Sequence, residues 1–305
     1  MNAQLRATFI GSISIFLWGT LALLTALTEG RIPALQLMAM TFAIAFALMC
    51  LRWWRQGHSG IRHLRQPPLA WLIGVGAYSG YHFCYFEAMR RAPAAEVSML
   101  AYLWPLLIVL LVALRPGEKL TAQVLAGALI ALGGCWLLIG GGSTGFSSEY
   151  LAGYALAGLC ALIWSGYSVS GRAIRAVPTD AVGWFCAATA LLATAGHLLF
   201  ETTVWPDSGL QWLGVIGLGL GPVGIAFFTW DHGIKNGDVA LLGVLAYAAP
   251  LISVLLLVAV GITEPGWSLM LAALAIVAGS LLAGLARVER RKAIGTAARA
   301  ATGNA

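Results

Sequence analysis

Ten apolar runs of about 20 residues each take up most of this 305-residue chain. Because an α-helix rises about 1.5 Å per residue, about 20 residues cross the roughly 30 Å hydrocarbon core of a bilayer. The runs lie at about 7–27, 34–51, 69–89, 94–113, 120–140, 150–171, 179–199, 209–230, 238–260 and 267–286. Only 10% of the residues are charged and 60% are apolar, a balance that excludes a soluble globular protein. The sequence therefore predicts an all-α polytopic membrane protein with ten transmembrane helices.

One segment of the chain occurs twice. Residues 101–112 (AYLWPLLIVLLV) match residues 246–257 (AYAAPLISVLLL) at seven of twelve positions, including a shared Tyr-x-x-Pro. Such self-similarity indicates an internal duplication. Five spans per copy is an odd number, so the second copy must enter the membrane from the opposite side. We therefore expect two inverted repeats, at 7–140 and 150–287, which is the usual construction of secondary transporters with a substrate site near mid-membrane.

The basic residues predict the orientation of the chain. Fifteen of the eighteen Lys and Arg residues fall in the N-terminus, in every second loop and in the C-terminal segment. By the positive-inside rule, both termini are cytoplasmic. The basic tail at 288–305 is then expected to face anionic membrane lipids, and to be disordered beyond Ala293.

Aromatic side chains gather near the predicted middle of the membrane. Tyr78, His82 and Tyr85 are spaced to share one helix face, with Tyr81 alongside. Tyr78 lies about 14 Å from the start of its span, too deep for an interfacial aromatic belt. Further rings at a similar level are Trp18, Tyr102, Trp104, Trp164 and Tyr247. We predict that these nine residues line a substrate site.

Two prolines occupy matching mid-membrane positions, Pro105 and Pro250. Each lacks an N–H and so leaves the carbonyl four residues earlier, at Ala101 or Ala246, without its helical donor. One interpretation is a purely structural kink, at which a neighbouring helix satisfies the carbonyl. The symmetric pairing of the two prolines favours instead a role in a hinge or in lining a cavity. Free carbonyls and tyrosine hydroxyls there could accept hydrogen bonds from a bound substrate, and His82, tryptophan N–H groups and helix ends could donate them.

Charged residues are predicted to avoid the membrane centre. Glu87 is expected to pair with Arg90 or Arg91 at a helix end, and Asp231 and Lys235 to bracket a short loop, together with Asp238. Coupled carriers usually bury an acidic residue at mid-membrane, so the pattern predicts uncoupled facilitated efflux. A proton relay through His82 is the alternative.

Motifs for phosphate binding, zinc proteolysis and serine hydrolysis are absent from the sequence. The five cysteines fall singly in apolar runs, which predicts free thiols with no disulfide or metal role. We expect no enzyme activity, cofactor, metal or nucleic-acid partner, and a monomer. An intramembrane lipid-handling enzyme remains an alternative, although its candidate groups Ser79, His82 and Glu87 lack a catalytic partner.

These features together resemble a known family. Trp18-Gly19, the A-Y-L-W-P-L segment followed by Gly117-Glu118, and Ala246-Tyr247-x-x-Pro250 with Glu264 are similar to EamA-type members of the drug/metabolite transporter superfamily. The resemblance implies a basket-like bundle in the bacterial inner membrane. Spans 1, 3, 4, 6, 8 and 9 would surround a central cavity, with spans 5 and 10 peripheral. Within the family the chain most resembles exporters of aromatic amino acids. The resemblance implies that the free carbonyls and tyrosine hydroxyls would bind the substrate ammonium group, and that His82, tryptophan N–H groups or helix ends would bind its carboxylate. A multidrug or other metabolite exporter is the alternative.

Overall fold

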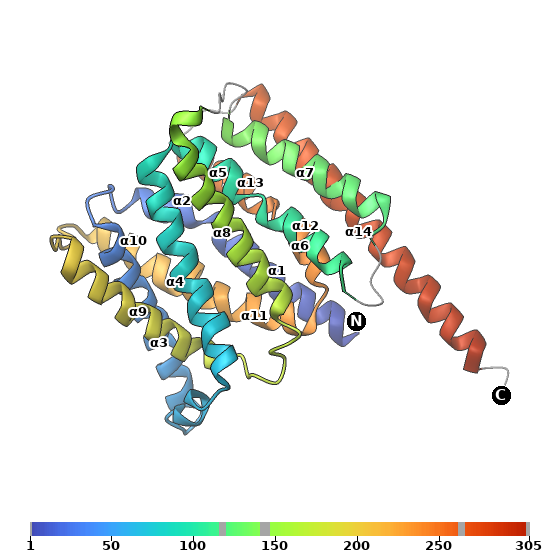
Figure 1. Cartoon of the computed structure of the whole chain (residues 1–305), viewed down its shortest axis with the longest axis horizontal. Coiled ribbons are helices and arrows are strands. Elements are labelled where there is room, and N and C mark those ends of the chain that lie inside the picture. Colours follow the sequence, from blue (N-terminus) through green and yellow to red (C-terminus); the bar gives the residue numbers. More distant parts are fainter. Residues whose placement is uncertain (1, 116–119, 141–146, 262–265, 303–305) are drawn as a thin grey trace.

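The computed structural model describes residues 2–115, 120–140, 147–261 and 266–302, and every regular element in these ranges is a helix (Figure 1). The helices are α1 (Ala3–Gly19), α2 (Leu21–Ala26), α3 (Ala34–Arg55), η1 (Ile61–Leu64), α4 (Pro68–Arg91), α5 (Ala94–Ala101), α6 (Trp104–Ala113), α7 (Ala122–Gly140), η2 (Ser148–Tyr150), α8 (Leu151–Ser170), α9 (Ala181–Phe200), α10 (Gly209–Leu218), η3 (Gly219–Ile225), α11 (Ala226–Asn236), α12 (Val239–Leu245), α13 (Ala248–Ala259) and α14 (Trp267–Thr302). The all-α prediction is confirmed over these ranges. Gly117, Glu118 and Glu264 lie outside them.

Seven helical stretches among the described residues are long and apolar enough to cross a membrane. They are Ala3–Ala26, Ala34–Arg55, Glu96–Ala113, Ser148–Ser170, Ala181–Phe200, Gly209–Asn236 and Val239–Ala259. Two shorter apolar helices, Ala122–Leu137 and Trp267–Ala283, accompany them. The protein is therefore a multi-pass membrane protein.

The helices that carry the paired prolines are interrupted, as their sequence predicts. α5 ends at Ala101 and α6 begins at Trp104, which puts Pro105 in the first turn, where a missing N–H costs no helical hydrogen bond. Pro250 likewise lies in the first turn of α13. The Ala246 carbonyl lacks its usual helical donor, as Pro250 predicts, and accepts instead from the Ala249 N–H at 3.0 Å, so it is not left free. This bond joins residues three apart, as in a 3₁₀ turn, which is tighter than the four-residue turn of an α-helix.

A third interruption lies between α10 and α11, where η3 is a π-helical stretch that contains Pro222. A π-turn widens the backbone, and such turns often occur at functional sites. The indole N–H of Trp18 donates to the Pro222 carbonyl at 3.0 Å, which fastens α1 to this stretch. No feature recognised in the sequence predicted the π-turn.

α7 and α14 lie side by side along one edge of the bundle (Figure 1). A Cβ added to Gly127 would come within 2.5 Å of the Gly279 carbonyl oxygen, so only glycine allows this approach. α14 then continues to Thr302, beyond the rest of the bundle in Figure 1. The prediction of a disordered tail beyond Ala293 is therefore wrong over the residues described, since the helix extends through them.

Candidate functional site

Aromatic rings from six different helical elements meet inside the bundle, and we call this group the ring cluster. Its members are Trp18 (α1), Phe42 (α3), Tyr78, Tyr81 and His82 (α4), Trp104 (α6), Trp164 and Tyr167 (α8), and Phe227 and Trp230 (α11). Six of these ten rings are among the nine predicted substrate residues. Aromatic pairs at such separations each contribute about 0.5–1.5 kcal/mol beyond area burial.

Trp18 lies at the centre of the tryptophans in this cluster. Its ring centroid is 6.1 Å from that of Trp104, 5.7 Å from Trp164 and 5.0 Å from Trp230. On the other side, Tyr78 stacks on Phe227 at 4.6 Å. The cluster therefore brings together side chains from both halves of the duplicated sequence.

The face of α4 predicted from the sequence does point to this cluster. The Tyr81 centroid is 5.6 Å from that of Trp164, and Tyr81 also stacks on Tyr85 at 5.9 Å. His82 Nδ1 lies 2.7 Å from the Tyr78 carbonyl oxygen, which fixes Nδ1 as the donor and leaves Nε2 as an acceptor. Tyr78 is fully buried, whereas Tyr81, His82 and Tyr85 are half-buried. The accessible surface of this face thus lies toward the C-terminal end of α4.

Tyr102 and Tyr247 pack elsewhere. Both belong to a second apolar group with Cys135 of α7 and Ile276 of α14. Tyr247 is completely buried there. The structure therefore brings these two predicted site residues next to the peripheral helices and not into the ring cluster.

A buried polar chain, which the sequence analysis did not find, leaves the ring cluster from Tyr78. The Tyr78 and Tyr167 hydroxyls lie 3.0 Å apart, and the Tyr167 hydroxyl donates to Asp231 Oδ1 at 3.3 Å. Asp231 Oδ2 is 2.8 Å from Lys235 Nζ and accepts from the Thr179 hydroxyl at 2.7 Å. Side-chain exposure is 1% for Asp231 and 2% for Lys235.

The prediction that Asp231 and Lys235 bracket a loop is wrong, because α11 continues through both of them to Asn236. The predicted run stopped at the first charged residue. The i, i+4 spacing of an acid and a base was the available signal, since it allows the two side chains to pair on one helix face.

The helix ends around this ion pair are tightly closed. The Asp238 N–H donates to Thr8 Oγ1 at 2.9 Å. Gly11 and Gly233 face one another so closely that a Cβ added to Gly233 would lie 2.7 Å from the Cα of Gly11. A Cβ added to Gly171 would lie 2.8 Å from Ile234. These contacts join α1, α11 and the segment after α8.

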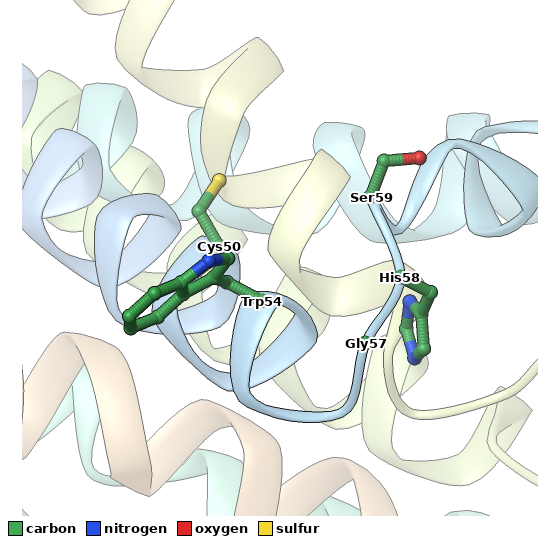
Figure 2. Close-up of a pocket in the computed structure, with 5 residues that line it drawn as sticks. All are labelled: Cys50, Trp54, Gly57, His58 and Ser59. Carbon is green, nitrogen blue, oxygen red and sulfur yellow. The ribbon is translucent and has the colours of Figure 1, made fainter.

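A surface hollow lies at the C-terminal end of α3, lined by Cys50, Trp54, Gly57, His58 and Ser59 (Figure 2). It takes in none of the ring-cluster residues. The thiol of Cys50 and those of the other four cysteines are free, as predicted.

Next to this hollow, His58, His63 and Asp180 place potential metal-ligand atoms within 4.8 Å of one another. Arg62 Nε donates to His63 Nε2 at 3.0 Å, and Arg52 pairs with Asp180 at 3.3 Å. These cations occupy the ligand atoms and repel a metal ion. Burial lowers the pKa of His63 below its ordinary value of 6.5, and the Asp180 carboxylate only partly offsets this effect.

The sequence matches the EamA-like transporter family twice, over residues 5–140 and 151–285. It is 50% identical to the aromatic amino acid exporter YddG of Ancylobacter novellus, over 92% of this chain and 97% of that protein. YddG of Salmonella typhimurium is 30% identical, over 95% of this chain and all of its own length. A solved crystal structure that is 50% identical superposes with a TM-score of 0.86, over 92% of this chain and 98% of its own. These relatives are transporters and not enzymes, and the chain belongs to the EamA-like transporter family.

Proposed function

We propose that this protein exports aromatic amino acids across the bacterial inner membrane by alternating access. The observation that carries the proposal is the ring cluster, which joins aromatic side chains of both sequence halves inside the bundle. Rings there offer stacking and apolar contact to an aromatic side chain. The 50% identity to an exporter of aromatic amino acids supports the same substrate class.

The proposed architecture is ten transmembrane helices arranged as two inverted repeats, 7–140 and 150–287, around a central cavity. Three features support it. The family model matches twice, and the helices are interrupted at matching places before Pro105 and Pro250. In addition to the seven stretches named above, α4 is long enough to cross the membrane. Both termini would be cytoplasmic, with residues 288–305 facing anionic lipids. Pro105 and Pro250 would serve as hinges, and the functional unit would be a monomer.

Uncoupled facilitated efflux is the proposed energetics. Asp231 is a buried acid, but Lys235 lies 2.8 Å from it, so the pair carries no net charge that must be moved or neutralised. Proton coupling is the second candidate, because Asp231 and His82 are both titratable groups inside the bundle.

Efflux of labelled phenylalanine and tryptophan from proteoliposomes, with and without a pH gradient, tests the proposal. We expect wild-type efflux down the substrate gradient that a pH gradient leaves unchanged. Trp18→Ala and Tyr78→Ala should reduce efflux at least about tenfold, as expected for loss of about 1.4 kcal/mol of contact. Trp205→Ala, at an exposed loop residue, is the matched control.

Wild-type protein that moves flat hydrophobic cations but neither amino acid would replace this proposal with a multidrug exporter. Acceleration of efflux by an imposed pH gradient would favour proton coupling. Unchanged efflux in both ring variants would remove the ring cluster from the substrate path.

A further inference from the structure

The ring cluster offers stacking contact to an aromatic side chain, but several of the groups predicted to bind the charged end of an amino acid are already engaged. The Ala246 carbonyl accepts from Ala249, and the Trp18 indole donates to the Pro222 carbonyl. The Trp230 indole donates to Ser168 Oγ at 3.1 Å. A zwitterion needs a partner for its ammonium group and one for its carboxylate, because desolvating either charge alone is costly.

Asp231 and Lys235 supply such a pair of charges. An ionisable residue inside a membrane protein is expensive to keep there, which makes it a candidate for function. Asp231 lies five residues before the end of α11, about 8 Å inside that helix. A buried ion pair adds little to stability relative to apolar residues of the same size, so stability alone gives no reason for one here.

Three groups from other elements complete the shell of this pair. Tyr167 and Thr179 hydroxyls donate to Asp231, and Lys235 Nζ donates to the Val177 carbonyl at 3.0 Å. Each of them mimics half of a zwitterion: the hydroxyls are donors, as an ammonium group is, and the carbonyl is an acceptor, as a carboxylate is. All three come from α8 and the segment between α8 and α9, whereas the ion pair is on α11.

Tyr167 connects this shell to the ring cluster. Its ring centroid is 5.4 Å from that of Trp164 and 5.5 Å from that of Tyr78, while its hydroxyl reaches Asp231. One tyrosine side chain therefore spans the gap between the rings and the charges. An aromatic amino acid has the same arrangement, with a ring at one end and both charges on a single carbon at the other.

We propose, on the basis of the export function proposed above, that Asp231 and Lys235 form the zwitterion-binding site of the transport path. When α11 separates from the segment between α8 and α9, the substrate ammonium replaces the Thr179 and Tyr167 hydroxyls on Asp231. Its carboxylate replaces the Val177 carbonyl on Lys235. When the segment returns, the protein's own groups retake these positions and the end of the bundle closes behind the substrate.

Competition against labelled phenylalanine efflux, in proteoliposomes that contain the full chain, tests this site. The probes are L-phenylalanine, phenylalanine amide, which lacks the carboxylate, and 3-phenylpropionate, which lacks the ammonium group. Wild type should prefer phenylalanine over each analogue by about tenfold or more, as a charge-assisted contact predicts. Lys235→Gln should lose the preference over the amide, and Asp231→Asn the preference over phenylpropionate.

The matched control is Glu87→Gln/Arg91→Gln, which removes an ion pair of the same spacing from an exposed position and should keep both preferences. Because one unpaired buried charge can prevent folding, Asp231→Asn/Lys235→Gln removes both charges together and should lose both preferences. Thr179→Val keeps the ion pair but removes a competing hydroxyl, and it should lower the half-saturation concentration for phenylalanine about threefold.

Preferences that survive in the folded double variant would overturn the zwitterion site, as would an unchanged half-saturation concentration in Thr179→Val. If either result is found while the wild-type protein still transports phenylalanine, only the zwitterion site is refuted and the export function is supported. Absence of phenylalanine transport in wild type would instead refute the export function itself.

Discussion

The two halves of the chain carry ion pairs with the same i, i+4 spacing in contrasting surroundings. Glu87 and Arg91 precede the matched Tyr102 near the end of α4, and Asp231 and Lys235 precede Tyr247 near the end of α11. Side-chain exposure is 22% and 55% in the first pair but 1% and 2% in the second. The duplicated sequence thus places a similar pair twice, and the packing around it decides whether solvent or protein completes its shell.

This difference in exposure gives the two ion pairs different roles. An exposed helix pair is solvated and screened by salt, and contributes little to stability. A pair excluded from water depends on each neighbouring donor and acceptor, so it responds to any movement of those neighbours. A movement that separates neighbouring elements should therefore change the energy of the ion pair more at the end of α11 than at the end of α4.

The largest expected effect comes from locking the closed end. Gly171→Cys and Ile234→Cys, in a background without native cysteines, should form a disulfide, because a Cβ on Gly171 would lie 2.8 Å from Ile234 Cγ1. We expect oxidation to abolish efflux and a reductant to restore it. The single variant Ile234→Cys controls for the substitution. Full efflux in the cross-linked protein would show that this end does not open during transport.

The second effect is on folding. Asp231→Asn should lower the free energy of unfolding by about 3–5 kcal/mol, because it leaves Lys235 buried without its counter-charge. Glu87→Gln at the exposed pair should cost about 0–1 kcal/mol. Reversible unfolding in mixed micelles measures both. Equal losses of unfolding free energy in the two variants would contradict the distinction between the buried pair on α11 and the exposed pair on α4.

A smaller effect follows from the tyrosine link. Tyr167→Phe leaves the ring in place and removes a hydroxyl that contacts both Tyr78 and Asp231. The free energy of unfolding should fall by about 1–3 kcal/mol. Tyr150→Phe, in the short helix before α8, should change stability by less than about 0.5 kcal/mol. The same unfolding assay compares them. A neutral Tyr167→Phe would mean that the ring cluster and the ion pair act independently.

The smallest effect concerns pH at the contact of His63 with Asp180. Since burial lowers the pKa of His63, the folded state favours the neutral ring, and its stability is complete above about pH 6.5. Acidification below that value should reduce the unfolding temperature as the ring is forced to protonate. His63→Gln should flatten this dependence between pH 7 and pH 5. An unfolding temperature that rises on acidification would show that the Asp180 attraction dominates instead.

Much of the fold was predictable because membrane insertion imposes simple rules. Run length and composition gave the helical class, and the paired Pro105 and Pro250 gave the helix interruptions. The ring face of α4 followed from helical spacing, since residues at i, i+4 and i+7 share a face whatever their neighbours are.

The missed features depend on partners that are distant in sequence. Tyr247 matches Tyr102 in sequence, yet both pack on α7 and α14, a contact that no local pattern encodes. The sequence analysis did not single out Tyr167 or Trp230, and it placed Asp231 at the start of a loop. They become a connected site only where α8 and α11 meet.

The sequence by itself determined that this chain is a duplicated helical membrane protein with aromatic residues along one face of α4, because hydrophobic length and periodicity act within one segment. Tertiary structure decided which rings meet, and that Asp231 and Lys235 are buried together. Burial depends on the whole set of neighbouring helices, and it is burial that changes a weak surface ion pair into a site whose charges must always find partners.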